Sequence, residues 1–182
     1  MSEPVEGSAF RSVMRRVPAP VVVVTARGEA EARGITIGSF TSVALDPPLV
    51  SFNVGKESRM HGIMEACSAF AVHVLSEKQV HLAKRFATPG LTADEQFEAL
   101  SYHTRTGSDL PLLNDVTARL LCTPEDSIVA GDHTLYIGQV VEIEEPPDAG
   151  AVLYYQSSYR GVGSELPSTE LSPVKRVSSD SS

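Results

Sequence analysis

Residues 34–54, GITIGSFTSVALDPPLVSFNV, are the stretch of this chain that best predicts its fold. Four hydroxyl side chains lie there between two strand-like runs: Thr36, Ser39, Thr41 and Ser42. Asp46-Pro47-Pro48 then breaks the first run, because proline lacks an N–H and restricts the residue before it. An extended segment, Leu49–Val54, follows. The stretch predicts a strand, a hydroxyl-rich segment, a turn and a second strand.

Hydroxyl groups and backbone N–H donors in such a segment can converge on a small anion without a large positive charge. For a phosphate, the favoured side chains are those of Thr36, Ser39 and Ser42. Ser58 and Arg59 add to them, because they stand at a predicted helix start, where free amides and the helix dipole favour an anion. Two alternatives stay open: the hydroxyl cluster is ordinary strand surface, and Ser58 is only a helix cap.

Length and composition limit the class of protein. A chain of 182 residues with 42% hydrophobic residues fits one domain with a real core. Its net charge of −8 and the lack of a Lys/Arg-rich run argue against nucleic acid as a partner. The first eight residues lack a signal-peptide pattern and no apolar stretch is long enough for a bilayer, so a soluble cytoplasmic protein is predicted.

Cysteine and histidine spacing predicts neither a metal site nor a disulfide. Cys67 and Cys122 are isolated in apolar surroundings and are expected to be buried free thiols. The five histidines show no paired spacing typical of metal ligands. The chain also lacks a nucleophile elbow, a P-loop and a GxGxxG fingerprint, which argues against a hydrolase of the α/β type, a nucleotide triphosphatase and a Rossmann dehydrogenase.

Strand patterns outnumber helical ones along the chain. Short helices are predicted over 9–16, 58–66, from a capping box at 76–79 to 86, and from 92. Strands are predicted over 21–25, 70–75, 116–123, 128–130 and 134–145, with a hairpin connection at 26–33 and a turn at 124–126. This order favours a mainly β fold, an antiparallel Greek-key-like barrel with short helices. Residues 1–163 are expected to form the domain, and the polar residues 164–182 a disordered tail.

The chain resembles the flavin reductase-like family, the FMN-binding split barrels that include reductase components of two-component flavin-dependent monooxygenases. Beyond residues 34–54, the resemblance is carried in order by 70–75 with Gln79, 85–87, 131–138, and 153–155 with 159–160. It covers roughly residues 10 to 162. Two places depart from the usual pattern of the family. Small or hydroxyl residues are common where this chain has Ile37-Gly38, and Ser is frequent where it has Ala44.

The resemblance implies a site for FMN or FAD, with NADH or NADPH as hydride donor. The alternation over 50–54 places Ser51 and Asn53 on one face, for the polar edge of the flavin ring, and Phe52 and Val54 on the other, with their backbone as a further contact. The complete set of predicted flavin-binding residues is Thr36, Ile37, Gly38, Ser39, Ser42, Val43, Ser51, Phe52, Asn53, Val54, Ser58, Arg59, Arg85, Phe86 and Tyr159.

His133 is the candidate catalytic residue. It follows Gly131-Asp132, a tight-turn sequence, and opens the predicted strand 134–145. A lone histidine is as well explained by a structural role, but the resemblance implies a place near the nicotinamide and flavin rings. Tyr159 and Arg160 are similar candidates for covering the cofactor or for contacting the phosphates of the dinucleotide, and a subunit interface is an equal alternative.

The resemblance implies an NAD(P)H-dependent flavin reductase. Such an enzyme works by positioning, since hydride transfer needs no protein nucleophile. The resemblance also implies a homodimer and an oxygenase that receives the reduced flavin. Two alternatives remain: a non-catalytic flavin-binding protein for storage, sensing or electron relay, and an interaction module without cofactor, to which the departure at Ile37-Gly38 points.

Overall fold

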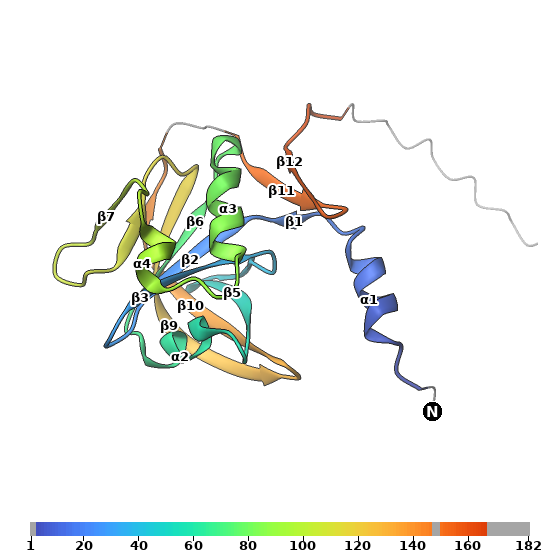
Figure 1. The fold of residues 1–182 in the computed structure, drawn as a ribbon, viewed down its shortest axis with the longest axis horizontal. Coiled ribbons are helices and arrows are strands. Elements are labelled where there is room, and N and C mark those ends of the chain that lie inside the picture. The colour runs from blue at the N-terminus through green and yellow to red at the C-terminus, as the bar shows by residue number, and fades with distance from the viewer. Residues whose placement is uncertain (1–2, 147–149, 167–182) are drawn as a thin grey trace, which may run out of the picture.

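The computed structural model describes residues 3–146 and 150–166 and has a mainly β fold with short helices (Figure 1). The helices are α1 (Gly7–Met14), α2 (Arg59–Ala66), the 3-10 turn η1 (Glu77–Gln79), α3 (Val80–Ala87) and α4 (Ala93–Phe97). The strands are β1 (Ala19–Pro20), β2 (Val22–Arg27), β3 (Ala32–Ile37), β4 (Thr41–Leu45), β5 (Pro48–Gly55), β6 (Phe70–Val74), β7 (Tyr102–Thr104), β8 (Pro111–Leu113), β9 (Ala118–Ala130), β10 (His133–Glu144), β11 (Val152–Tyr155) and β12 (Ser158–Gly161).

Seven strands form one antiparallel sheet in the order β3-β2-β6-β9-β10-β5-β4. The sheet curls round a core to which six of these strands and α2 contribute, with Phe52 and Phe70 in edge contact at a centroid distance of 5.4 Å. Met60, Ile63 and Met64 of α2 pack against this core. The curled antiparallel sheet confirms the predicted barrel.

A second apolar layer covers the outer side of the barrel. Leu82, Ala83 and Phe86 of α3 pack on Val21 and Val23, whose side chains face away from the barrel core. Leu110 and Leu112, just before and on β8, pack on Ala71 and Leu121 in a separate small cluster. Strand β2 is therefore buried on both faces, which explains why its sequence is a continuous valine run without alternation.

The β3 edge of the sheet is closed by a side chain. Gly34 N donates to Gln96 Oε1 at 3.2 Å, and Gln96 Nε2 donates to Gly34 O at 3.1 Å, so the amide of Gln96 completes the ladder as a further strand would. Gln96 belongs to α4, which the predicted capping box begins: Glu95 N donates to Thr92 Oγ1 at 3.2 Å.

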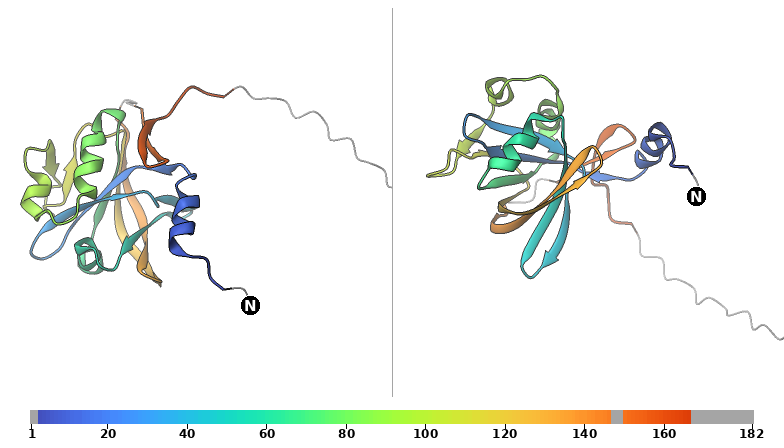
Figure 2. Two further views of the ribbon diagram at one scale, coloured as in Figure 1. Left: turned by 45° about the vertical axis from the view of Figure 1, so that its right-hand side comes forward. Right: turned by 90° about the horizontal axis from the view of Figure 1, so that it is seen from below.

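Two features lie apart from the barrel. Strands β1, β11 and β12 form a separate small sheet. Helix α1 stands clear of the barrel in both further views (Figure 2), and none of its residues is buried. Within the described residues, every helix is too short or too polar to cross a lipid bilayer.

Several predicted elements need correction. The turn at 124–126 is wrong, because β9 runs unbroken through it. Gly138 pairs with Pro124 and Ile137 with Asp126, so Glu125 is an extra residue in a β-bulge, and a bulge accommodates a proline within a strand. Helix α1 begins and ends two residues earlier than predicted, and the connection at 26–33 shrinks to residues 28–31.

The small-sheet hairpin of β11 and β12 was not predicted. Its turn residues Gln156 and Ser157 both have positive φ, 48° and 61°, without the Asn-Gly pair typical of such turns. The predicted tail lies mostly outside the described residues, since only residues 164–166 of it are described.

The two cysteines are buried and free, as the sequence predicts. Burial raises the pKa of Cys67 to about 11 and that of Cys122 to about 12, because a thiolate is poorly solvated in the apolar interior. Both thiols are therefore protonated and unreactive near neutral pH.

Candidate functional site

Two adjacent clefts share Ile35 and Thr36 on β3. The first, called here the hairpin cleft, has a volume of about 720 Å³ and is lined by Ile35, Thr36, Ile37, Gly38, Ser39, Asn53, Gly55, Ile128, Ala130, His133 and Leu135. The second, called the helix cleft, has a volume of about 530 Å³ and is lined by Arg33, Gly34, Ile35, Thr36, Glu57, Ser58, Arg59, Met60, Phe86, Ala87, Thr88, Pro89, Gly90, Leu91 and Gln96.

The hairpin cleft combines an apolar wall with a polar margin. Ile128, Ala130 and Leu135 supply the wall from the β9–β10 hairpin. Hydroxyl, amide and imidazole groups supply the margin from three separate segments of the chain. Such a lining suits a flat ring with apolar faces and a polar edge.

Hydrogen bonds fix the hydroxyl-rich segment in place. Asn53 N donates to Ser39 Oγ at 2.9 Å, which ties the end of β3 to β5. Thr36 Oγ1 donates to Ala83 O of α3 at 2.7 Å, so its proton is committed while its lone pairs remain as acceptors. The Ser39 hydroxyl oxygen accepts this structural hydrogen bond, and its proton remains available for donation to a ligand.

His133 opens β10 directly after the turn Gly131-Asp132. Gly131 has a φ of +61°, a conformation that suits glycine, and Asp132 is not among the residues with positive φ, as expected for a two-residue hairpin turn that begins with glycine. The His133 side chain is 49% exposed, and its Nδ1 lies 2.7 Å from Asp132 Oδ1. On β5, Gly55 pairs with His133 in the ladder.

The imidazole of His133 lies beside Gly55. A Cβ at this position would lie 3.7 Å from His133 Nε2, within van der Waals contact. The backbone of Gly55 and the imidazole both line the hairpin cleft. Nε2 is therefore the ring nitrogen on the side of Gly55, and Nδ1 the one on the side of Asp132.

The helix cleft holds the features expected of a phosphate site. Met60 N donates to Ser58 Oγ at 3.2 Å, which confirms Ser58 as the N-cap of α2. Ser58 and Arg59 line the cleft at this helix start, where the dipole and free N–H groups favour an anion. Cap and anion site are therefore compatible, because the cap uses only one of the first-turn amides.

Arg33 places a buried cation in the same cleft. Its Nε donates to Glu31 Oε1 at 2.6 Å and its Nη1 to Leu91 O at 3.0 Å. The hydrogen bond from Arg33 lowers the pKa of Glu31 below its usual value, with a smaller electrostatic contribution from Arg59. Arg33 therefore holds the loop before α4 against β3.

The structure brings together eight predicted residues and the candidate histidine. Thr36, Ile37, Gly38, Ser39, Asn53 and His133 line the hairpin cleft, and Thr36, Ser58, Arg59 and Phe86 line the helix cleft. Their roles toward a ligand remain predictions.

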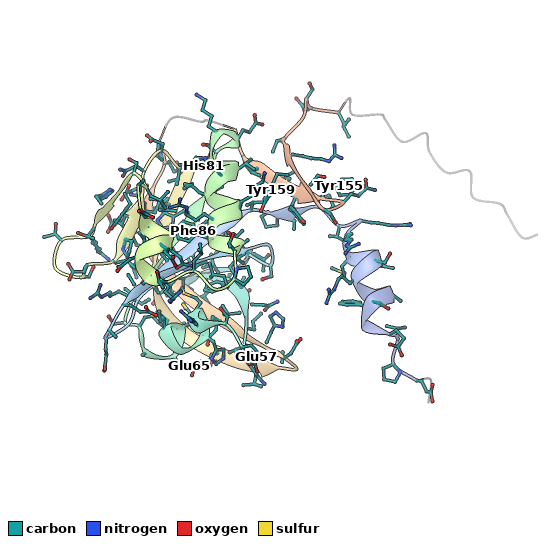
Figure 3. All side chains as sticks on the ribbon, in the orientation of Figure 1. Glu57, Glu65, His81, Phe86, Tyr155 and Tyr159 are labelled. Atoms are coloured by element: carbon teal, nitrogen blue, oxygen red, sulfur yellow. The ribbon has the colours of Figure 1, made fainter. Side chains whose placement is uncertain are left out.

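Seven predicted residues line neither cleft: Ser42, Val43, Ser51, Phe52, Val54, Arg85 and Tyr159. Phe52 and Val54 point into the barrel core, as the alternation predicts, and Ser51 is buried. Arg85 donates to the backbone of Glu95 and Glu98 instead. Tyr159 lies on the β11–β12 hairpin and packs against the outer apolar layer, with Phe86 farther down α3 (Figure 3).

Sequence reasoning missed several lining residues. Leu135 shares a strand face with His133, so the alternation of β10 contained a signal for it. The pairing of β9 with β10 brings Ile128 and Ala130 to the hairpin cleft. Contacts between segments distant in the sequence place Arg33 and Gln96 at the helix cleft. No local pattern marks these last two.

A curled antiparallel sheet with short flanking helices and a cleft at its side defines the class of β split barrels. The sequence matches the family described as "Flavin reductase like domain" over residues 14–163, and the chain belongs to this family.

Curated relatives and a solved structure agree with this assignment. An NADH:FMN oxidoreductase of Rhodococcus qingshengii is 36% identical over 154 residues, 82% of this chain and 79% of the relative. The reductase component of a 4-nitrophenol 4-monooxygenase/4-nitrocatechol 2-monooxygenase of Rhodococcus opacus is 30% identical over 142 residues, 78% of this chain and 74% of the relative. The structure of the NADH:FAD oxidoreductase SgcE6 of Streptomyces globisporus C-1027, in complex with NAD and FAD fragments, has a TM-score of 0.80 at 34% identity, covering 89% of this chain and 98% of that one.

Proposed function

We propose that this protein is an NADH-dependent flavin reductase, an oxidoreductase that passes a hydride from reduced nicotinamide to FMN or FAD. The observation that carries the proposal is the pair of adjacent clefts that share Ile35 and Thr36, one with a lining that suits a flat ring and the other with a lining that suits a phosphate. Relatives that cover most of this chain act on FMN or FAD with NADH by name, which supports the same reaction.

The residues present fit a flavin. The wall of Ile128, Ala130 and Leu135 would face the ring, and Thr36, Ser39 and Asn53 would meet its polar groups and side chain. Ser58 and Arg59 would hold the phosphate at the start of α2. Bound flavin supplies the hydride-accepting centre; the chain binds and orients the reactants and excludes water.

The test is the oxidation of NADH, and separately NADPH, by the purified protein with and without FMN or FAD. Oxidation that depends on added flavin supports a reductase. Flavin binding without oxidation by either nicotinamide would favour the non-catalytic alternative. Protein that gains no thermal stability from flavin would favour the interaction module, since a ligand of the native state must stabilise it.

A matched pair of variants locates the flavin. Ile128→Glu introduces a carboxylate into the apolar wall and should raise the flavin KM at least tenfold, because burying an unpaired charge against the ring is costly. Val129→Glu places the same charge on the adjacent exposed residue, outside the cleft lining, and should leave the flavin KM near that of the wild type. Equal effects of both would argue against this cleft.

Exposed apolar side chains support a homodimer as part of the proposal. Phe10, Val13 and Met14 of α1 are exposed, and Leu45 of β4 is 90% exposed. Apolar surface of this kind is covered in stable assemblies, and a second copy of the chain would cover it by symmetry. Sedimentation across a dilution series tests this: a monomer at every concentration would contradict the dimer, and Leu45→Lys should weaken it.

Transfer of reduced flavin to an oxygenase is a further part of the proposal. The Rhodococcus opacus relative is the reductase component of a monooxygenase, which supports such a partner. The cytoplasmic location that the sequence predicts stays a prediction. Product formation by an added flavin-dependent monooxygenase, driven by NADH and this protein across a dialysis membrane, would test whether the flavin is released.

A further inference from the structure

The carboxylate of Asp132 faces one nitrogen of the candidate catalytic histidine. Asp132 Oδ1 lies 2.7 Å from His133 Nδ1, and this hydrogen bond, with the accompanying electrostatic attraction, lowers the pKa of Asp132 below its usual value. An ionised carboxylate has only acceptors to offer, so Nδ1 must carry the proton. The neutral imidazole therefore has its free lone pair on Nε2.

The turn that carries Asp132 is itself clamped to β5. Lys56 N donates to Asp132 O at 3.0 Å, and Lys56 Nζ donates to Gly131 O at 2.7 Å. Lys56 also adds a favourable electrostatic contribution to the ionised form of Asp132. Two segments 75 residues apart thus fix the backbone of the turn from which the Asp132 side chain extends to the imidazole.

We propose that Asp132 is a positioning residue, which holds His133 with Nδ1–H toward the carboxylate and leaves Nε2 on the side of Gly55 and the hairpin cleft. The part of this inference that concerns turnover rests on the proposed function. Neutral His133 then accepts a hydrogen bond at Nε2, and protonated His133 donates one from the same atom. The ring need not turn between these two uses, because Nδ1 is engaged in both.

A direct readout exists in the protein without flavin or nicotinamide. Long-range ¹H–¹⁵N correlation spectra distinguish the two neutral tautomers of an imidazole, and the His133 signals are assigned by their loss in His133→Ala. In the wild type above neutral pH, we expect His133 to be protonated at Nδ1. In Asp132→Asn, the amide can donate or accept, so a mixture with the Nε2-protonated tautomer should appear.

Two spectral outcomes would overturn the proposal: His133 protonated mainly at Nε2 in the wild type, or an unchanged tautomer in Asp132→Asn. The matched control is Asp126→Asn, which removes the same charge from the same hairpin. Asp126 is exposed and accepts a hydrogen bond only from the neighbouring Ser127 N, at 2.7 Å, among the contacts that the structure describes for it. Its variant should retain the wild-type tautomer.

Kinetics then test whether the positioning matters for turnover. Asp132→Asn should lower kcat about fivefold, the scale of a solvent-exposed charged pair, with the flavin KM little changed. In a His133→Ala background the same substitution should have no further effect, because Asp132 acts through the imidazole. An equal loss of kcat in both backgrounds would overturn the proposal.

The two proposals fail in different ways. A wild-type protein without flavin-dependent NADH oxidation would refute the proposed function, while the tautomer spectra would still decide the role of Asp132. A wild-type protein that oxidises NADH with flavin, but whose His133 tautomer does not depend on Asp132, would refute only the role of Asp132.

Discussion

The ring of Phe86 occupies the space in which Gly34 would carry a side chain. A Cβ built on Gly34 would lie 2.6 Å from two atoms of this ring, closer than real contacts allow. Phe86 in turn meets Phe97 edge to face, with centroids 5.4 Å apart. The contact joins β3, α3 and α4 at the helix cleft, and it makes Gly34 a requirement of packing.

Gly34→Ala should therefore be destabilising. The methyl group would force the Phe86 ring to shift, at a cost of about 1–3 kcal/mol in the free energy of unfolding. Urea denaturation measures the change. Gly62→Ala is the control: nothing lies near an added Cβ there, and alanine in this exposed position of α2 should stabilise by about 1 kcal/mol. If Gly34→Ala unfolds with the same free energy as the wild type, the Phe86 ring can shift without cost and the prediction is wrong.

Gln96→Glu should weaken both the β3 edge and flavin binding. The carboxylate cannot donate to Gly34 O, which costs about 1–3 kcal/mol of stability when that acceptor stays buried and unpaired. The new negative charge also lines the helix cleft and would repel a phosphate, so the flavin KM should rise while the NADH KM stays nearly constant. Gln139→Glu on β10 tests the charge change outside both clefts, and an equal rise of flavin KM there would contradict the assignment.

His73 should make the protein sensitive to mild acid. Burial lowers the pKa of His73 to about 3, helped by the nearby charges of Arg119 and His103; its Nδ1 donates to Val23 O at 3.0 Å and its Nε2 accepts from Leu113 N at 3.1 Å. In the unfolded chain, the pKa of a histidine is about 6.5. Below that pH only the unfolded state binds the proton, so the free energy of unfolding should fall by up to about 1.4 kcal/mol per pH unit.

The measurement is urea denaturation at several pH values between 7 and 4.5, for the wild type and for His73→Gln. Other groups contribute equally to both proteins, so the difference in slope isolates His73. Stability of the wild type should fall more steeply below pH 6.5. Parallel curves would mean that His73 takes up its proton with the same pKa in the folded and unfolded states, which would contradict the prediction.

Gly138→Ala should be among the most destabilising single substitutions in the barrel. A Cβ on this residue of β10 would overlap the ring of Phe70, which is fully buried in the core. Thermal unfolding should show a loss of about 3 kcal/mol, the upper end of the range for overpacking. Phe70→Leu frees the space, so the double variant should be more stable than the sum of the two single effects predicts. Simple additivity would contradict the direct clash.

Local patterns account for what the sequence predicts well. The cap at Ser58 and the capping box at Thr92 each lie within four residues of their partners, and both form as expected. The alternation of residues 50–54 correctly sends Phe52 to the core. These features depend on neighbours in the chain, which a sequence displays directly.

Long-range pairing explains what was missed. Gln96 reaches Gly34 across 62 residues, and no property of a lone glutamine indicates that partner. Pro124 is typical of a turn, but pairing with β10 keeps β9 extended and absorbs the irregularity as a bulge. The predicted Arg85 bonds to the backbone beyond α4 for the same reason: its position depends on where another segment folds.

The amide of Gln96 also bears on how copies of this protein can associate. Helices α3 and α4 pack against β3, and both backbone groups of Gly34 are already paired with Gln96. A strand from another molecule therefore finds no free N–H or C=O at Gly34 on this edge of the sheet. The other edge of the seven-stranded sheet is β4. Two molecules joined there would each keep Gly34 paired at the opposite edge, which disfavours extension of the seven-stranded sheet by further copies.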